Sequence, residues 1–520
     1  MLIKTTIEGV GEKSIELKEI PSTPKLKVHF QRHPDYKGEY GFDWFRDYYE
    51  TKLADKNKLQ DLKNEYTPCK INNQDYFVPW LTLMPNATAE LVLKVELNEG
   101  VKIKRNASGK IILPNHSGLK FIPAEIEISA LRDEQEFKVT VECLSPLAAD
   151  AKLEVTIDTD NQVVGKLNVL KNKVVPKVNL RFVKVVVYPG TYLNKDEKKE
   201  YASEEAYLKD VLKQHDIPNF SKTRAFNQAL IDVNIDAGDY VIELDGTTLA
   251  NEGKINGYDI IDDEFAKGLG KDLFARYRDA YELQTKDQSG PEEKHLVVFQ
   301  TILQRFVLAS TIGGESSLTD FSGRSCLIYD AGLERVVDYV HEVGHVLGCL
   351  HPFVDADTDR KLEGTLTVWE SNKEKYEAEI NLRKADIIKY EEQKQDIVNK
   401  IPEQEARIRT YNEYVKQGIQ VARAKENIIV CQTNIFGFNK SIEAIHVALE
   451  KRANEISKLE ANIARDKVLK QQCMELKKQN PYVFDNKSTT LNFMDYSSKR
   501  VDFYYWQWLA MQSEIQHYYS

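Results

Sequence analysis

The sequence predicts a multidomain α+β protein, in which a β-sandwich precedes a mixed α/β domain that is interrupted by a long helical hairpin. Three patterns support this prediction. Apolar and polar residues alternate with period two over about 88–178, strand-like and helix-like segments follow over 179–367, and apolar residues recur by sevens within 368–480. A chain of 520 residues holds enough material for several separate cores.

The first region, 1–87, is of mixed character. Lys25–Phe30 alternates like a strand, and we interpret the aromatic cluster Tyr40–Tyr49 as packing in a core or an interface. Gly38–Trp44 also resembles a segment of proteins linked to type VI secretion in Bacteroidetes. That resemblance implies a protein partner in a secretion system.

Residues 88–178 are expected to form the sandwich. Four segments alternate as half-buried strands do, with turn signals between them: Leu91–Glu96, Ala124–Ile128, Phe137–Val141 and Leu153–Ile157. Short strands at this spacing predict an immunoglobulin-like arrangement. We expect such a domain to act as a spacer or a docking surface rather than to carry chemistry.

The mixed domain is expected over 179–367 and is completed by 481–520. Its predicted elements are a helix at Ser203–Gln214 and strands at Leu180–Val187, Tyr240–Leu244, His295–Phe299, Phe306–Thr311 and Cys326–Tyr329. The last of these strands leads directly toward a motif rich in histidine.

That motif, HEVGHVLGCLH, begins at His341 and matches the pattern HExxHxxGxxH. Residues four apart share one face of a helix, so His341 and His345 can bind one Zn²⁺. Glu342 can act as a general base toward a water at the metal. Gly348 permits the turn that brings His351 back as a third ligand. HExxH alone occurs by chance in on the order of one per cent of chains this long, and the added glycine and histidine lower that chance by roughly a thousandfold.

The alternative interpretation is an amphipathic core helix with incidental histidines. Its apolar face would be Tyr339, Val340, Val343, Val346 and Leu347. Three histidines and an acid on the other side would be an unusual way to build such a helix, which favours the metal site. Cys349 is either a further metal ligand or, since three ligands and a water already complete a catalytic zinc, a small residue that packs beneath the turn.

Near the C-terminus, Leu491–Ser497 reads LNFMDYS, and together with HExxHxxGxxH it resembles the metzincin family of zinc peptidases. The resemblance implies that Met494 forms a turn beneath the histidines and that Tyr496 approaches the zinc and stabilises the oxyanion. It also implies a mixed sheet in which the strand Val307–Thr311 is the edge that pairs with an extended peptide substrate.

Within the metzincins, the wording HEVGH, Phe353 and NFMDYS resembles the pappalysins, whereas Pro352 resembles the serralysins. Two features depart from the pappalysin pattern. No cysteine follows Cys473, although disulfides are usual near that turn, and 494 − 351 = 143 positions separate His351 from Met494. Neither departure affects the zinc ligands, but both leave the cleavage specificity open.

The segment after the third histidine has alternating carboxylates at Asp355, Asp357 and Asp359. Oxygen ligands of this kind suit Ca²⁺, and a solvated acidic loop would have the same sequence. Both interpretations stay open at this point.

Residues 368–480 are expected to form a helical hairpin of coiled-coil type. Ile380, Ile387, Ile401, Ile408 and Val415 recur by sevens, as do Ile442, Leu449, Ile456 and Ile463. Gly437 and Asn439 are predicted to break the two arms, and Pro402 to kink the first arm. The hairpin is either a structural spike or an arm that binds a partner.

Composition excludes several classes of function. A net charge of −10 argues against nucleic acid as a partner, and no apolar run approaches the roughly 20 residues of a transmembrane helix. The first residues lack the apolar core of a secretory signal, and six scattered cysteines give no disulfide framework. The location of the protein stays unknown, with export by a dedicated machine as an open route.

The sequence therefore predicts a zinc metalloendopeptidase that acts on protein or peptide substrates and is a candidate exported effector or toxin. The alternative is a component of a secretion apparatus or an adhesion system whose metal site is vestigial. Metal content and cleavage of a protein substrate would separate the two.

Overall fold

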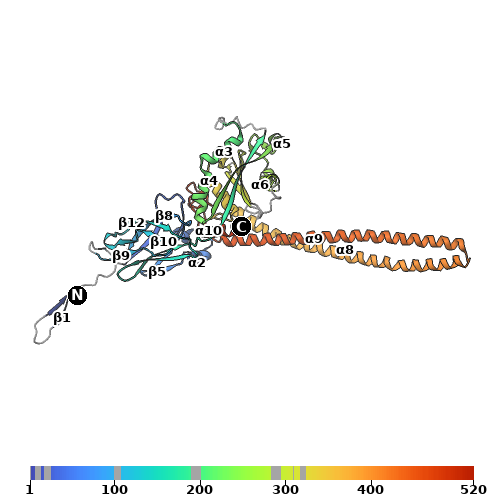
Figure 1. The fold of residues 1–520 in the computed structure, drawn as a ribbon, viewed down its shortest axis with the longest axis horizontal. Helices are drawn as coiled ribbons and strands as arrows, with labels where there is room; N and C mark the ends of the chain where they lie inside the picture. The colour runs from blue at the N-terminus through green and yellow to red at the C-terminus, as the bar shows by residue number, and fades with distance from the viewer. Residues whose placement is uncertain are drawn as a thin grey trace. The chain divides into compact units, whose positions relative to one another are not determined.

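The computed structural model describes residues 2–5, 13–16, 25–98, 103, 107–188, 201–282, 294–307, 310–316 and 324–519. The protein divides into two compact units, Met1–Asp355 with Leu476–Ser520, and Ala356–Glu475. All strands of the described residues belong to the first unit, and the second consists of two long helices (Figure 1). The predicted mixture of α and β structure is confirmed.

The N-terminal part of the first unit contains two sheets that share one hydrophobic core. One sheet has the order β10-β12-β8-β3, and the other has the order β11-β9-β13-β14-β7-β4. Their bounds are β3 (Leu26–Arg32), β4 (Gly41–Asp43), β7 (Trp80–Thr82), β8 (Thr88–Leu97), β9 (Lys110–Ile112), β10 (Leu119–Ile122), β11 (Glu125–Glu127), β12 (Glu136–Cys143), β13 (Ala151–Ile157) and β14 (Val163–Val169).

This sandwich begins at Leu26 rather than at residue 88. Three of its strands come from the region that the sequence analysis set apart as 1–87, and β3 pairs antiparallel with β8. Strands of three residues such as β4 and β7 are too short to display a period, so only their packing assigns them to the sheet. The immunoglobulin-like arrangement stays a prediction. The other elements of this region are β1 (Leu2–Thr5), β2 (Lys13–Glu16), α1 (Tyr48–Lys52), α2 (Leu59–Glu65), β5 (Cys69–Ile71) and β6 (Gln74–Tyr76).

A five-stranded sheet follows, with the order β16-β15-β19-β23-β22. Neighbouring strands are parallel except β22, which runs antiparallel to β23 at one edge. Every residue of the central strand β19 is buried. The bounds are β15 (Lys177–Tyr188), β16 (Asp232–Asp245), β19 (His295–Thr301), β22 (Gly314–Ser316) and β23 (Ser325–Ile328).

The predicted edge strand Val307–Thr311 is wrong. Residues Phe306–Val307 (β20) and Ser310–Thr311 (β21) pair with each other in a separate two-stranded ribbon, and β22 forms the antiparallel edge of the sheet. The apolar run at 306–309 predicted a strand, but it does not determine which strand it pairs with. That choice depends on long-range packing.

Helices pack around this sheet. Ser203 caps α3 (Glu204–Gln214) by accepting a hydrogen bond from the Ala206 N–H, so the predicted helix is confirmed. The other helical elements are α4 (Ile217–Phe220), α5 (Gly246–Asn251), α6 (Asp263–Tyr277), α7 (Val336–Val346) and α10 (Tyr505–Tyr518). A short ribbon of β17 (Ile255–Asn256) and β18 (Asp259–Ile260) completes this part.

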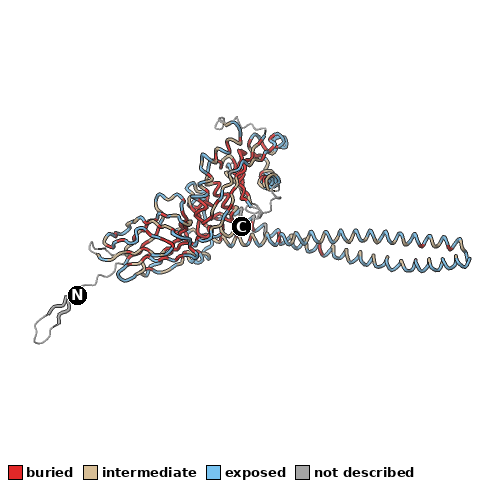
Figure 2. Tube along the Cα trace, viewed as in Figure 1, coloured by how far each residue is buried: buried red, intermediate tan, exposed pale blue. Residues whose placement is uncertain are grey.

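The second unit is built from α8 (Ala356–Lys416) and α9 (Val421–Gln479), the last residues of which belong to the first unit. Ion pairs such as Arg383–Glu455, at 2.8 Å, join the two antiparallel helices. The positions that recur by sevens are buried or half-buried, while most of the other described residues of the two helices are exposed (Figure 2). No helix in the described ranges has both the length and the apolar character needed to cross a membrane.

Two predicted details of the hairpin are wrong. Its first helix starts at Ala356 instead of residue 368, and the turn lies at 417–420, where Gly418 has φ 71°. Gly437 lies inside α9. Glycine in a helix costs roughly 1 kcal/mol relative to alanine, which a long helix tolerates. Gly418 takes the turn because glycine adopts the left-handed region without strain.

Candidate metal centre

The first two histidines lie on α7, and the third follows the end of that helix. The Leu347 and Cys349 N–H groups donate to the carbonyl oxygens of Val343 and Gly344 and so close the last turn. Gly348 has φ 86°, a conformation that favours glycine and reverses the chain. The predicted turn is therefore present, and it directs His351 back toward the helix.

The three Nε2 atoms converge. Those of His341 and His345 are 3.1 Å apart, those of His345 and His351 are 3.1 Å apart, and those of His351 and His341 are 3.2 Å apart. In a tetrahedral zinc site with bonds of about 2.0–2.1 Å, two ligand nitrogens lie about 3.3 Å apart. Among the described residues, these three buried side chains are the group that could hold a metal ion.

Each histidine is oriented through its Nδ1 atom. Nδ1 of His341 is 2.9 Å from the Phe493 carbonyl oxygen, and Nδ1 of His345 is 2.8 Å from the Cys349 carbonyl oxygen. Nδ1 of His351 is 2.8 Å from Oδ2 of Asp355. All three partners are acceptors, so each Nδ1 carries the proton and donates it. The Nε2 lone pairs are thus left for a metal, as in metal sites with a supporting outer shell.

Burial also keeps His341 and His345 neutral. It lowers the pKa of His341 and of His345 well below the usual value, and the neighbouring histidines lower both further. An unprotonated imidazole is the form that binds a cation. The donor set therefore fits a small divalent ion that accepts nitrogen ligands.

Glu342 lies beside the histidines and is 8% exposed. Burial raises the pKa of its carboxyl group to about 8. A hydrogen bond from Ser316 lowers the pKa, but its effect is smaller than that of burial. The edge strand β22 approaches closely here, because a β-carbon on Gly314 would lie 2.6 Å from Cγ of Glu342. A cation at the histidines would favour the carboxylate, since opposite charge lowers the pKa of an acid.

Met494 packs against α7 at Gly344. Its side chain is fully buried, and a β-carbon on Gly344 would lie 2.5 Å from its sulfur. Glycine at position 344 of the motif therefore makes room for the methionine. The preceding carbonyl, that of Phe493, is the one that accepts from His341.

Buried amide and carboxylate groups hold this turn in shape. Nδ2 of Asn492 donates to Oε1 of Gln507 at 2.7 Å, and Oδ1 of Asn492 accepts from the Met494 N–H at 2.9 Å. The Asp495 carboxylate accepts from the N–H groups of Thr490, at 2.8 Å, and Tyr496, at 2.7 Å. The shape of the turn thus depends on side chains as well as on the backbone.

Tyr496 reaches the histidines. Its hydroxyl oxygen is 3.2 Å from Nε2 of His351, while the side chain as a whole is 49% exposed. Burial of the hydroxyl raises its pKa, and so does the charge of Glu342. The hydroxyl therefore keeps its proton at neutral pH and can act as a hydrogen-bond donor.

A buried ion pair ties α7 to the loop after the methionine turn. Arg500 donates to Oδ1 of Asp338 at 2.7 Å, and both side chains are 7% exposed. Asp338 lies one helical turn before Glu342. Asp338 also pairs with Arg335, so two arginines share this buried carboxylate.

In this geometry Cys349 and Asp355 make contacts other than metal ligation. The Cys349 thiol is buried and lies 3.9 Å from the Gln507 carbonyl oxygen, as expected of a packing residue. The Asp355 carboxylate accepts from His351, and α8 begins at Ala356. The side chains of Asp357 and Asp359 lie outside the described residues, so the calcium site stays a prediction.

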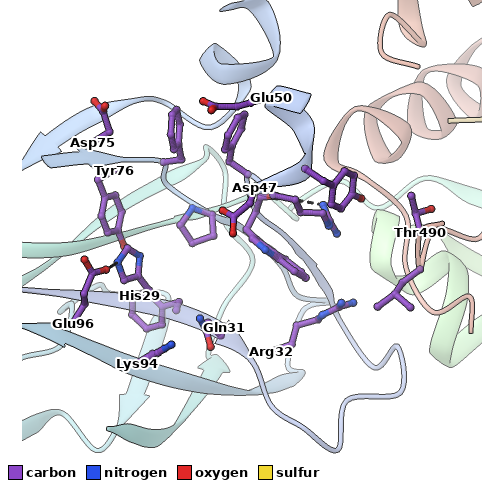
Figure 3. Close-up of a pocket in the computed structure, with 18 of the residues that line it drawn as sticks. His29, Gln31, Arg32, Asp47, Glu50, Asp75, Tyr76, Lys94, Glu96 and Thr490 are labelled. Atoms are coloured by element: carbon purple, nitrogen blue, oxygen red, sulfur yellow. Dashed lines mark hydrogen bonds and ion pairs between the residues drawn. The ribbon is translucent and has the colours of Figure 1, made fainter. Parts of the chain in front are cut away.

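A cavity of about 1050 Å³ lies elsewhere in the first unit, over β3 and β8 of the sandwich (Figure 3). None of the three histidines lines it. Arg32 donates to Asp502 at 2.8 Å, Arg46 donates to the same carboxylate at 3.2 Å, and both guanidinium groups lie over the Trp44 ring. These contacts give both arginines a carboxylate partner and join the predicted aromatic cluster to the C-terminal segment.

All of the site residues expected from the sequence lie together around the histidine group that could hold a metal ion, namely His341, Glu342, His345, His351, Met494 and Tyr496. The supporting residues were not found by sequence reasoning. Asp355 had a signal, since an acid four residues after a ligand can turn back to it. For the rest, which are Asp338, Asn492, Asp495, Arg500 and Gln507, the sequence carries no local signal.

Comparison with known proteins adds no family assignment. Neither the protein-family models nor the curated proteins give a match to this sequence. The case for a function therefore depends on the residues of the metal centre and on their geometry.

Proposed function

We propose that this protein is a zinc-dependent endopeptidase of the metzincin type. The observation that carries the proposal is the convergence of three Nε2 atoms within 3.2 Å, each with its Nδ1 atom held by an acceptor. The Glu342 carboxyl group lies next to them in a buried position, which is where hydrolysis requires a base. An incidental set of histidines in a core helix would have no reason to be oriented in this way.

The residues have complementary roles in the proposed reaction. Zinc, when bound, would lower the pKa of a water molecule to about 7 and polarise the scissile carbonyl. Glu342 takes the proton from the attacking water and passes it to the nitrogen of the leaving amine as the C–N bond breaks. The Tyr496 hydroxyl donates a hydrogen bond to the oxyanion that develops on the carbonyl oxygen.

The edge strand β22 suits an extended peptide substrate. It is the last strand of the sheet and has β23 as its neighbour. Gly314 at its start lies so close to Glu342 that a β-carbon there would overlap its side chain, so a peptide that pairs with β22 would pass the base. This strand takes the role that the sequence analysis gave to Val307–Thr311.

The second candidate function is a component of a secretion apparatus or adhesion system with a vestigial metal site. It is favoured by the separate helical unit, where apolar side chains such as Ile429, Phe436 and Val447 are exposed. If the protein is instead an exported peptidase, as in the first proposal, the same hairpin of coiled-coil type would be the surface that binds a protein partner. The sandwich is the other surface for such a partner.

The test measures metal content and cleavage together. We expect purified protein to hold about one zinc per chain and to cleave casein, with activity lost to a chelator and restored by zinc. A variant with His341, His345 and His351 changed to alanine is the control and should lose both properties. Zinc binding without cleavage of casein or of a broad peptide library would support the second candidate instead.

A further inference from the structure

The third histidine is held differently from the other two. His341 and His345 are fixed along α7, and their Nδ1 atoms bind backbone carbonyls. His351 lies beyond the helix end, and its Nδ1 atom binds a side chain, that of Asp355. The position of the third ligand therefore depends on groups that a substitution can remove.

Asp355 is the last residue before α8, and Asn480 is the first residue after α9. Nδ2 of Asn480 donates to the Gly348 carbonyl oxygen at 2.8 Å, and its Oδ1 atom accepts from the Leu350 N–H at 3.1 Å. Asn480 thus holds both sides of the chain reversal that leads to the third ligand. Its side chain has 8% exposure, so water cannot readily replace it.

The segments that enter and leave the helical insertion are also joined by an isolated β-bridge between Phe353 and Phe484. The Phe484 N–H donates to the Pro352 carbonyl oxygen at 2.8 Å, and the Val354 N–H donates to the Phe484 carbonyl oxygen at 2.9 Å. Between them, the Phe353 ring stacks on His351, with 4.7 Å between ring centroids. The segment from 352 to 355 therefore fixes both the plane of the His351 ring and its Nδ1 atom.

We propose that Asp355 and Asn480, the two residues that flank the helical insertion, are positioning residues that set the metal affinity of the centre through His351. Asp355 holds the ring with its proton on Nδ1, and Asn480 holds the backbone that carries the ring. This inference rests on the proposed metal site, but it does not require peptidase activity. It also places the insertion at the point where the chain supports the third ligand.

The experiment measures zinc affinity in the full chain by competition with a chromogenic chelator. We expect Asp355→Ala and Asn480→Ala each to weaken zinc binding by about 10- to 100-fold, the usual effect of losing an outer-shell partner. Asp355→Asn keeps an acceptor without the charge, so its affinity should lie between those of Asp355→Ala and the native protein. Asp485→Ala, an exposed carboxylate in the segment that follows α9, and Asn434→Ala in α9 are matched controls that should bind zinc normally.

A second readout does not need metal. In ¹⁵N-histidine-labelled, metal-free protein, the ring nitrogen shifts report the tautomer, and Asp355→Ala should move the His351 proton from Nδ1 toward Nε2. Native affinity in both alanine variants, or an unchanged His351 tautomer, would overturn the proposal. If the native protein binds no zinc, the proposed function fails, and the tautomer still decides the role of Asp355.

Discussion

The candidate metal centre and the helical hairpin are built on opposite principles. At the centre, α7, the loop after it and the turn at 490–496 each contribute buried side chains, and the Nδ1 atom of each histidine has a defined partner. In the hairpin, two helices of 61 and 59 residues meet along a half-buried seam, and most of their charged residues face outward. Contacts between residues far apart in the chain stabilise the first region, whereas the second follows from a short repeat within each helix.

This difference shows why we expect function in the first region and tolerance of substitutions in the hairpin. A ligand such as His351 depends on residues 4 and 129 positions away in the chain, at Asp355 and Asn480 (480 − 351 = 129). A hairpin position such as Glu443 lies on the exposed side of one helix. Substitutions at the centre should therefore have large, specific effects, and equivalent substitutions in the hairpin should have almost none.

The largest expected effect is that of Glu342→Gln. It should lower cleavage of a protein substrate by about 10²- to 10⁴-fold while about one zinc per chain is retained, because the substitution removes a base and leaves the ligands in place. Glu443→Gln in α9 is the matched control and should keep native kcat/KM. Unchanged hydrolysis in Glu342→Gln would falsify the proposed mechanism.

Tyr496→Phe should have the next largest effect. The hydroxyl is expected to act on the developing oxyanion, so kcat should fall by roughly tenfold to a thousandfold with little change in KM. Tyr414→Phe, an exposed tyrosine of α8, provides the comparison and should be silent. A change confined to KM would instead assign Tyr496 to substrate binding.

A smaller effect concerns stability and pH. Burial raises the pKa of Glu514 in α10 to about 7, above its value in an unfolded chain. The folded state therefore binds this proton more tightly, and stability falls as the pH rises from about 4.5 through 7. Glu514→Gln keeps the side chain neutral, so its midpoint of thermal unfolding should exceed that of the native protein at pH 8 and match it at pH 4. An equal gain at both pH values, or the same gain from Glu443→Gln, would contradict this assignment.

The smallest effect is expected from removing the hairpin. Residues Ala356–Glu475 would be replaced by a flexible Gly/Ser linker, which keeps Asp355 and Asn480 and costs mainly the modest entropy of loop closure. Zinc content and cleavage of a short peptide should be retained, because the pairing of Pro352 and Val354 with Phe484 lies within the first unit. Loss of zinc or aggregation would show that the helices complete the metal centre, and the contrast between the two regions would then be wrong.

The sequence by itself determined the features that depend on local spacing. Residues four apart on one helix bring His341 and His345 together, and glycine at 348 adopts the left-handed φ that returns His351. The seven-residue repeat likewise identified the seam of the hairpin, since a helix places those positions on one face. Each of these follows from backbone geometry within a few turns of chain.

Tertiary structure decided what depends on choosing among distant partners. It placed β22 rather than Val307–Thr311 at the sheet edge, put the hairpin turn at Gly418 rather than Gly437, and brought Asn480 to the loop before His351. A hydrogen bond between residues far apart has no periodicity to reveal it, because its energy is gained only once the whole core has folded. The convergence of the three histidines could therefore be predicted from spacing, whereas the groups that hold their ring atoms in position could not.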